Sequence, residues 1–325
     1  MPTPRPSLDE VVAVVRNHPA MGQKAAIALV REVFGAGDWF AGPGDDGAVV
    51  DVAGAQMVVC GEALFPPFVE HDPFGAGVAA VLTNVNDLAA MGAEPLAIVD
   101  TVVGDTDRCR TALEGMRYAS GLYGVPIVGG HLTILPGAPA MSAFGMGVAQ
   151  VPLTANAARP GHRLALLACL EGEMREDFPF FRSFDERGTQ LAGDVRLLAR
   201  LAAEGSCAAA KDVSMAGLVG SLAMLLEPTG CGVTLDLATL PCPAGVDLER
   251  WLVCFPCFAF LLCVPDGRLA DCERAAAERG LTCSELGVLD GTGQIRLRDS
   301  AGGSAEEVVA IDLAVETITG LKAPA

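Results

Sequence analysis

The apolar positions of the chain alternate between helical spacing and short runs typical of β-strands. Residues 8–34 repeat apolar side chains at helical spacing, Ser7 can cap them, and Gly35 and Gly37 interrupt the pattern, which predicts one opening helix. Further helices are predicted around Asn84 and Asp87 and at 107–123, 193–204 and 267–278, and residues 212–226 predict an acid and a small-residue turn followed by a helix. Strands are predicted at 48–52, 57–60, 96–103, 126–128, 142–150, 163–169 and 233–237, with 284–290 and 294–299 as a terminal hairpin.

Turns and loops separate these elements. Residues 129–131, Gly-Gly-His, predict a tight turn, whereas 62–72 and 178–189 predict loops. Because strands and helices mix in both halves, the sequence predicts two α+β domains. Small, polar and proline residues around 154–161 place the boundary between 1–156 and 157–325.

Two polar side chains interrupt an otherwise apolar helix. Asn84 and Asp87 lie three residues apart and share a helix face. A buried carboxylate must be hydrogen-bonded, paired with a cation or bound to a metal, and no lysine or arginine lies within helical reach of Asp87. From the residues alone, a local side-chain network near the helix end and a ligand site are both open.

The net charge of −18 argues against a nucleic-acid-binding protein, because such proteins use lysine and arginine to neutralise phosphates. An acidic surface also repels nucleotides unless divalent cations intervene, which indicates a metal requirement. The N-terminus has no apolar signal-peptide core, and no apolar run reaches membrane-spanning length. We therefore expect a cytoplasmic protein that has no membrane partner.

The cysteines indicate packing more than chemistry. There are eleven, an odd number, in mostly apolar surroundings, as expected for reduced thiols that act as small hydrophobic residues. Cys254 and Cys257 have the spacing of a redox or zinc pair, but they lie in 251–264, a run that predicts a buried strand, and no second pair stands at zinc-finger spacing. A packed strand is the favoured interpretation, and a chemical role of this pair is the alternative.

Three acidic motifs share one arrangement, in which an acid stands at the end of a strand or helix beside small residues. Magnesium prefers oxygen ligands and commonly joins a few carboxylates to substrate phosphates, and phosphoryl transfer depends mainly on positioning and charge neutralisation. Glycines would let backbone amides approach a phosphate closely. The motifs are Gly44-Asp45-Asp46-Gly47, Asn84-x-x-Asp87 and Asp212-Val213-Ser214-Met215-Ala216-Gly217, and Gly129 and Gly130 are further glycines of this kind.

The order of these motifs resembles the superfamily of aminoimidazole ribonucleotide synthetase, selenophosphate synthetase, thiamine-monophosphate kinase and the hydrogenase-maturation dehydratase, over most of the chain. Residues 45–49 are similar to its Asp-Asp-Ala-Ala-Val, residues 83–92 to its Asn-x-Ser-Asp-x-x-Ala-Met-Gly, and residues 212–218 to its Asp-x-Ser/Thr-x-x-Gly-Leu. The resemblance implies a dimeric, two-domain α+β fold of the PurM-like type, ATP as cosubstrate, and magnesium held by Asp46, Asp87 and Asp212.

The other candidate site residues fall into two groups. Candidates for nucleotide binding are Asp45, Asn84, Gly129, Gly130, Ser214 and Gly217. Candidates for catalysis are His131, which could donate to a phosphate or instead bond a backbone carbonyl, and Lys211, which could reach a phosphate as a point charge or instead be a solvated lysine.

The chain departs from selenophosphate synthetase, one of the two members it resembles most; the other is thiamine-monophosphate kinase. Selenophosphate synthetases carry a reactive cysteine or selenocysteine near the N-terminus, whereas residues 1–34 contain no cysteine. The acid before their Phe-Phe-x-Pro aligns with Ala63, and Glu62 beside it is a possible substitute. These departures argue against selenide as the substrate.

Two functional hypotheses remain. The first is an enzyme that uses ATP and magnesium to phosphorylate or activate a small-molecule acceptor. The second is a nucleotide-binding partner protein that has kept the fold without turnover. In either case the resemblance predicts a homodimer that hides the strands at 48–52 and 57–60, whose apolar faces would otherwise be exposed.

Overall fold

The computed structural model describes residues 7–35, 44–302 and 306–321. The chain divides into two compact units, each assembled from separated stretches of sequence. Unit 1 comprises Met1–Asp45, Leu153–Ser183 and Glu204–Ala325, and unit 2 comprises Asp46–Pro152 and Phe184–Ala203. The domains expected at 1–156 and 157–325 stay a prediction. Compact units that each combine separated stretches of the chain do not by themselves define domains.

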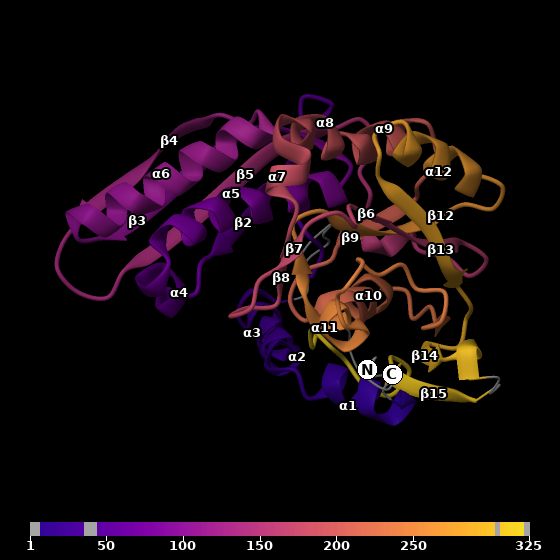
Figure 1. The fold of residues 1–325 in the computed structure, drawn as a ribbon. Helices are drawn as coiled ribbons and strands as arrows, with labels where there is room; N and C mark the ends of the chain where they lie inside the picture. The colour runs from indigo at the N-terminus through magenta and orange to yellow at the C-terminus, as the bar shows by residue number, and fades with distance from the viewer. Residues whose placement is uncertain (1–6, 36–43, 303–305, 322–325) are drawn as a thin grey trace. The chain divides into compact units, whose positions relative to one another are not determined.

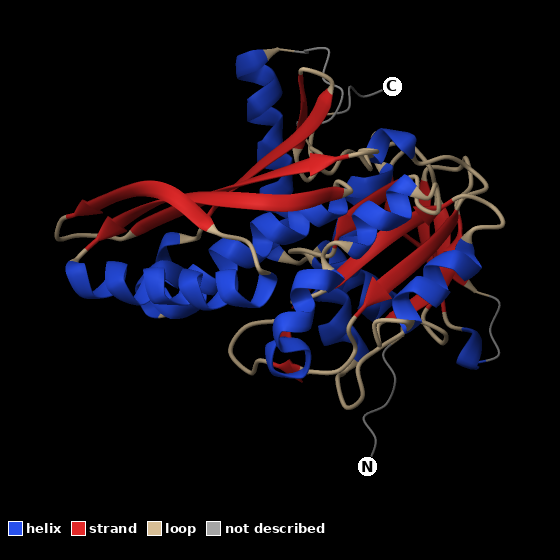
Figure 2. Cartoon of the chain, turned by 90° about the horizontal axis from the view of Figure 1, so that it is seen from above, coloured by secondary structure: helices blue, strands red, loops and turns tan. Residues whose placement is uncertain are grey.

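Unit 2 is a mixed five-stranded sheet, in the order β1-β2-β5-β3-β4, with helices along one face (Figures 1 and 2). Its strands are β1 (Ala48–Val52), β2 (Ala55–Ala63), β3 (Ala93–Gly104), β4 (Ile127–Ile134) and β5 (Ala140–Ala149). Its helices are α4 (Pro66–His71), α5 (Pro73–Ala90), α6 (Thr106–Tyr123), α7 (Phe184–Arg187), η3 (Gly188–Gln190), α8 (Leu191–Asp194) and α9 (Leu197–Ala203).

Helices α5 and α6 pack closely because glycines face each other's backbone. A Cβ atom on Gly77 would lie 1.9 Å from the carbonyl oxygen of Ala112, and one on Gly115 would lie 2.1 Å from that of Phe74. Alanine at either position would therefore push the helices apart. This contact holds α5, and with it Asp87, against the sheet.

The other face of the same sheet is apolar and exposed. Val59 pairs with Met146, and Phe144 pairs with Val99, and these four side chains are between 36% and 46% exposed. Val50 on β1 is 48% exposed. A contiguous apolar sheet face of this kind is unusual on the surface of a monomer.

Unit 1 contains several smaller sheets around the buried helix α10, in which all ten residues are buried. The strand orders are β13-β6-β12-β9, β10-β14-β15 and β11-β8-β7. Its strands are β6 (Arg163–Ala168), β7 (Glu173–Met174), β8 (Phe180–Arg182), β9 (Ala209–Asp212), β10 (Val233–Asp236), β11 (Phe255–Pro256), β12 (Ala259–Val264), β13 (Thr282–Val288), β14 (Gln294–Arg298) and β15 (Glu307–Asp312). Its helices are α1 (Leu8–Arg16), α2 (Pro19–Lys24), η1 (Ala25–Ile27), α3 (Ala28–Phe34), η2 (Ala155–Ala157), α10 (Gly217–Leu226), α11 (Leu248–Val253), α12 (Leu269–Ala277) and η4 (Ser300–Gly302).

The two ends of unit 1 pack together. Helix α1 buries Val11 and Val15 in the core of the unit, and the Arg16 guanidinium donates to the Ala310 carbonyl oxygen at 2.7 Å and to Glu316. The buried Glu227 carboxylate at the end of α10 accepts hydrogen bonds from the backbone amides of Ile318 and Thr319. The fold of unit 1 therefore needs the first and the last part of the described chain together.

The opening helix predicted over 8–34 begins and ends as expected, but it is not continuous. Ser7 caps α1 in a capping box with Glu10, and Gly35, with φ of 76°, ends α3. Pro19 interrupts the helix because it lacks an amide hydrogen and keeps the residue before it extended. The prediction of a single helix was wrong for this reason.

Other expectations were also wrong. The loop predicted at 62–72 contains α4, and the loop predicted at 178–189 contains β8 and α7. Gly129-Gly130-His131 lies inside β4 instead of forming a turn. Strands β13 and β14 do not form a hairpin, because β13 pairs with β6 and β14 pairs with β10 and β15. The run 251–264 contains the end of α11, short β11 and β12 instead of one strand, since α11 ends at Val253 and a bend at Cys257 and Phe258 separates β11 from β12.

None of the helices in the described ranges combines the length and apolar character needed to cross a lipid bilayer.

Candidate functional site

In unit 2, two carboxylates from distant parts of the sequence converge. Asp46 lies in the turn before β1, and Asp87 lies in the last part of α5. Each offers a carboxylate oxygen, and the two atoms lie within 4.8 Å of each other. The sequence placed these acids 41 positions apart, and the packing of α5 on β2, which pairs with β1, brings them together.

A thiol and an amide lie beside these two acids. The Cys60 thiol of β2 donates to Asn84 Oδ1 at 3.3 Å, and Asn84 Nδ2 donates to the Ala80 carbonyl oxygen at 2.8 Å. Burial, together with the negative charges of Asp87, Asp46 and Glu62, raises the pKa of the Cys60 thiol well above its usual value.

The fully buried Asn84 therefore belongs to a local network within the protein, one of the two interpretations that the sequence left open. Its assignment to the nucleotide stays a prediction. Glu62 is exposed on β2, two residues from Cys60, so its charge acts on the same neighbourhood as Asp46 and Asp87.

In unit 1, Asp212 ends β9 and is only 3% exposed. The Lys211 ammonium lies 3.0 Å from Asp212 Oδ1, and Lys211 itself is only 5% exposed. Lys211 is therefore not a solvated lysine, which was the alternative to a catalytic role. It partly balances the buried charge of its neighbour.

Ser214 and Gly217 shape the turn between β9 and α10. The Ser214 amide donates to Ser221 Oγ at 3.0 Å. Gly217 has φ of 75°, and a Cβ there would lie 2.1 Å from the Leu252 carbonyl oxygen. Glycine is thus required by the packing of α10 on α11, and its predicted approach to a phosphate stays untested.

The segment Gly129-Gly130-His131 lies in the edge strand β4 of unit 2. Gly130 pairs with Asp100 on β3, and a Cβ on Gly130 would lie 2.6 Å from Asp100 Oδ1. Asp100 is 7% exposed, and burial raises the pKa of its carboxyl group. The glycine therefore makes room for a buried acid, a close approach that glycine within a strand often marks.

His131 is exposed and pairs with Thr101, one position along from Asp100. Neighbouring residues of a strand point to opposite faces of a sheet. Cys60 and Ile98 pair with Gly145 from either side and share the face that α5 covers, as does Asp100. His131 therefore belongs to the opposite, open face of the sheet and does not join Cys60 and Asp87.

Two other features singled out in the sequence are Asp45 and the pair Cys254 and Cys257. Asp45 Oδ2 accepts a hydrogen bond from the Ala155 amide at 3.1 Å, which ties the motif to η2 in unit 1. Cys254 and Cys257 are fully buried, and burial raises the pKa of the Cys254 thiol well above its usual value. The described residues contain no group of three metal-binding side chains that includes either cysteine.

The donor set in unit 2 fits magnesium. Mg²⁺ binds oxygen at about 2.1 Å, so two of its ligands lie at most about 4.2 Å apart, close to the 4.8 Å limit for Asp46 and Asp87. Carboxylate oxygens are hard ligands, and a protonated thiol such as Cys60 does not compete for a hard cation.

Sequence reasoning missed Cys60 and Asp100. Cys60 lies in a predicted strand without any motif, and only its pairing beside Gly145 brings it to Asn84. The signal for Asp100 was an acid in the apolar strand run 96–103, which is as unexpected as Asp87 in its helix.

Comparisons with known proteins assign a family to the whole arrangement. Residues 44–149 match the family described as AIR synthase related protein, N-terminal domain, and residues 180–300 match the AIR synthase related protein, C-terminal domain. An uncharacterized protein of Synechocystis is 38% identical over 225 residues, covering 68% of this chain and 70% of that protein. An uncharacterized protein of Methanocaldococcus jannaschii is 27% identical, covering 97% and 99%. The selenide, water dikinase of Yersinia pseudotuberculosis is 25% identical, covering 75% and 82%.

Solved structures show the same fold. T. maritima PurL complexed with AMPPCP superposes with a TM-score of 0.72 at 18% identity over 97% of this chain, which spans 52% of the PurL chain. AaThiL complexed with AMPPCP and TMP superposes with a TM-score of 0.63 at 18% identity, over 83% of this chain and 91% of that one. The two matched domains cover more than half of the sequence, and their fold is the α+β, PurM-like fold. The chain belongs to the AIR synthase-related family.

Proposed function

We propose that the protein binds ATP with magnesium and transfers a phosphoryl group to a small-molecule acceptor, which it thereby activates. The observation that carries this proposal is the convergence of Asp46 and Asp87, within 4.8 Å, in a family whose solved members include nucleotide complexes. Two carboxylates held this close repel each other, and a divalent cation relieves the repulsion.

Asp46, Asp87 and Asp212 would hold the metal in this proposal, with Glu62 as a further acid beside Asp46 and Asp87. Bound magnesium would neutralise charge on the phosphates. The chain's own contribution is position: Cys60 and Ala80 fix Asn84 one helical turn from Asp87, and Lys211 fixes the Asp212 carboxylate at 3.0 Å. Asp45, Gly129, Gly130, Ser214 and Gly217 remain candidates for nucleotide contact.

Lys211 and His131 are the candidates for catalysis. Lys211 would move its ammonium group from Asp212 to a phosphate oxygen once the carboxylate had another cation as partner, and its burial would strengthen that interaction. His131 on the open sheet face could act only on a ligand that reaches this face.

The test combines binding with turnover. Calorimetry with ATP, with and without magnesium, measures the metal requirement, and turnover is then followed across amides, thiamine monophosphate and formylated nucleotides as acceptors. The enzyme proposal expects magnesium-dependent binding and one acceptor that raises ATP consumption. Binding that is indifferent to magnesium would contradict it.

A non-catalytic nucleotide-binding partner protein is the second candidate, because His131 and the acid pair belong to opposite faces of their sheet. This alternative expects magnesium-dependent ATP binding and no turnover with any acceptor. A thiamine-monophosphate kinase-like or selenophosphate synthetase-like activity would instead give turnover with the corresponding acceptor.

We also propose that the protein is a cytoplasmic homodimer. The apolar sheet face around Val59, Val99, Phe144 and Met146 supports this, since burying it against a second copy would remove a large apolar area from water. A monomer in sedimentation at micromolar concentration would contradict the homodimer. Phe144→Lys on this face should convert the dimer to a monomer.

A further inference from the structure

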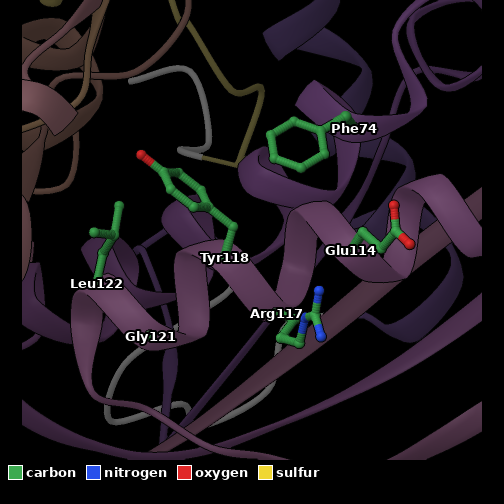
Figure 3. Close-up of a pocket in the computed structure, with 6 residues that line it drawn as sticks. All are labelled: Phe74, Glu114, Arg117, Tyr118, Gly121 and Leu122. Atoms are coloured by element: carbon green, nitrogen blue, oxygen red, sulfur yellow. The ribbon is translucent and has the colours of Figure 1, made fainter.

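A pocket lies in unit 2, on the side of α6 that faces away from the sheet. It has a volume of about 520 Å³ and is lined by Phe74, Glu114, Arg117, Tyr118, Gly121 and Leu122 (Figure 3). This volume lies within the range of about 300–1,000 Å³ typical of small-molecule sites. A stable protein interface needs roughly 800 Å² from each partner, usually from 20 or more residues. Six residues on two helices fit a small molecule better.

One wall of the pocket is aromatic and held in place. The rings of Phe74 and Tyr118 lie 5.8 Å apart at 44°, and Phe184 meets the Tyr118 ring edge-on at 6.4 Å. Phe74 and Tyr118 are nevertheless each 41% exposed. Two exposed rings held by a third offer a surface for an aromatic ring at little entropic cost.

Two opposite charges flank the rings and do not meet. Arg117 and Glu114 are three residues apart on α6, yet within the described chain neither forms an ion pair with the other or with another residue. Figure 3 shows the Glu114 carboxylate and the Arg117 guanidinium pointing in different directions. Two charges that do not neutralise each other can both bind a ligand.

The helix surface beside the rings is open. A Cβ on Gly121 would meet no atom within 4 Å, so the pocket has free space beside Tyr118 and Leu122. The structure thus combines a cation, an anion, an aromatic wall and room for a ligand within one face of α6.

We propose that this pocket binds a small zwitterion that carries an aromatic ring, of which a free aromatic amino acid is the simplest case. The ring lies against Phe74 and Tyr118, the carboxylate binds the Arg117 guanidinium, and the ammonium group binds Glu114. The pocket is independent of the acids of the proposed phosphoryl-transfer site, so either proposal can fail without the other.

Three probes that share an indole ring test the charges separately: tryptophan, indole-3-propionate, which lacks the ammonium group, and tryptamine, which lacks the carboxylate. Ligand-observed NMR on the full chain should show tryptophan binding about tenfold more tightly than either of the others, as expected for one additional charge-assisted contact. Equal affinities for the three probes, or no binding of any at millimolar concentration, would overturn the proposal.

Variants of two exposed arginines on the same helix provide the matched control. Arg117→Gln should weaken tryptophan binding about tenfold and leave tryptamine binding unchanged, whereas Arg110→Gln, outside the pocket, should change neither. Glu114→Gln should give the opposite pattern, with indole-3-propionate unaffected. Equal effects of Arg110→Gln and Arg117→Gln would show that general charge, not this pocket, holds the ligand. If Tyr118 became protected from solvent when the protein self-associates without any ligand, the pocket would belong to an interface with a second copy. That result would equally overturn the proposal.

Discussion

The acids of the two units differ in what balances their charge. In unit 2, Asp46 and Asp87 bring like charges together beside Cys60, with Glu62 acting on the same thiol. In unit 1, Asp212 has the ammonium group of Lys211 at 3.0 Å. An added cation would relieve the repulsion between Asp46 and Asp87, and in unit 1 an ammonium group already lies against the carboxylate. Charge removal should therefore affect ligand binding in unit 2, and both turnover and stability in unit 1.

The largest expected effect is on turnover by Asp212→Asn. If Asp212 stabilises charge that develops during phosphoryl transfer, turnover per folded molecule should fall at least about a hundredfold. The asparagine keeps the size of the side chain and can still accept from Lys211. Steady-state ATP consumption is measured beside the melting temperature, with Asp247→Asn, an exposed acid of unit 1, as the control. Normal turnover in a folded variant would leave Asp212 only a structural role.

The next effect is on stability. Lys211→Met leaves the Asp212 carboxylate buried without its lysine, which should cost about 3 kcal/mol of unfolding free energy. Urea unfolding measures this loss. The double variant Lys211→Met/Asp212→Leu, which removes both charges, should regain most of it. If the single variant is as stable as the parent protein, the ion pair does not support the fold.

Asp87→Asn tests unit 2. The substitution removes one of two converging charges, so ATP affinity in magnesium should fall about tenfold while the fold persists or becomes slightly more stable. Calorimetry with and without magnesium distinguishes a metal ligand from a structural acid. Asp107→Asn, which removes an exposed charge at the start of α6, should leave the ATP affinity and the stability of the fold unchanged. An Asp87 variant that keeps its magnesium-dependent affinity would refute the assignment.

The smallest effect concerns Asp100, an acid for which the described residues offer no hydrogen-bond donor or cation. Burial raises its pKa in the folded protein, so the folded state holds this proton more tightly than the unfolded chain. The cost of burying the charge is therefore absent below the unfolded pKa and complete above the folded one. Asp100→Asn should stabilise the protein by about 1 kcal/mol at pH 7, and the gain should vanish near pH 3. Unfolding curves at several pH values check this, and a gain that does not depend on pH would contradict it.

The sequence predicted most of the elements because their apolar spacing matches their burial. Helix α5 and strands β5 and β6 lie where the pattern placed them, since each is buried along one face or completely. The motifs also brought Asp46 and Asp87 into one hypothesis before their distance was known. Local spacing and motif order were sufficient for these features.

The rest depends on contacts that local spacing does not contain. Gly130 suggested a turn, but a glycine is needed there because a Cβ would collide with the Asp100 side chain on the neighbouring strand. Lys211 could not be recognised as buried, because the strand that pairs with its own comes from residues 259–264, about 50 positions later. The separation of β13 from β14 likewise depends on which sheet each strand joins.

The pairing of the two ends of unit 1 has a consequence during synthesis on the ribosome. Helix α1 is synthesised long before these partners, because Arg16 binds Ala310 and Glu316, about 300 residues later. At 5–20 residues per second, roughly 15–60 s pass before this partner exists. Most of unit 2 can already form in that time, while the apolar face of α1 is still exposed to solvent. Nascent chains stalled before residue 307 should therefore recruit chaperones through α1.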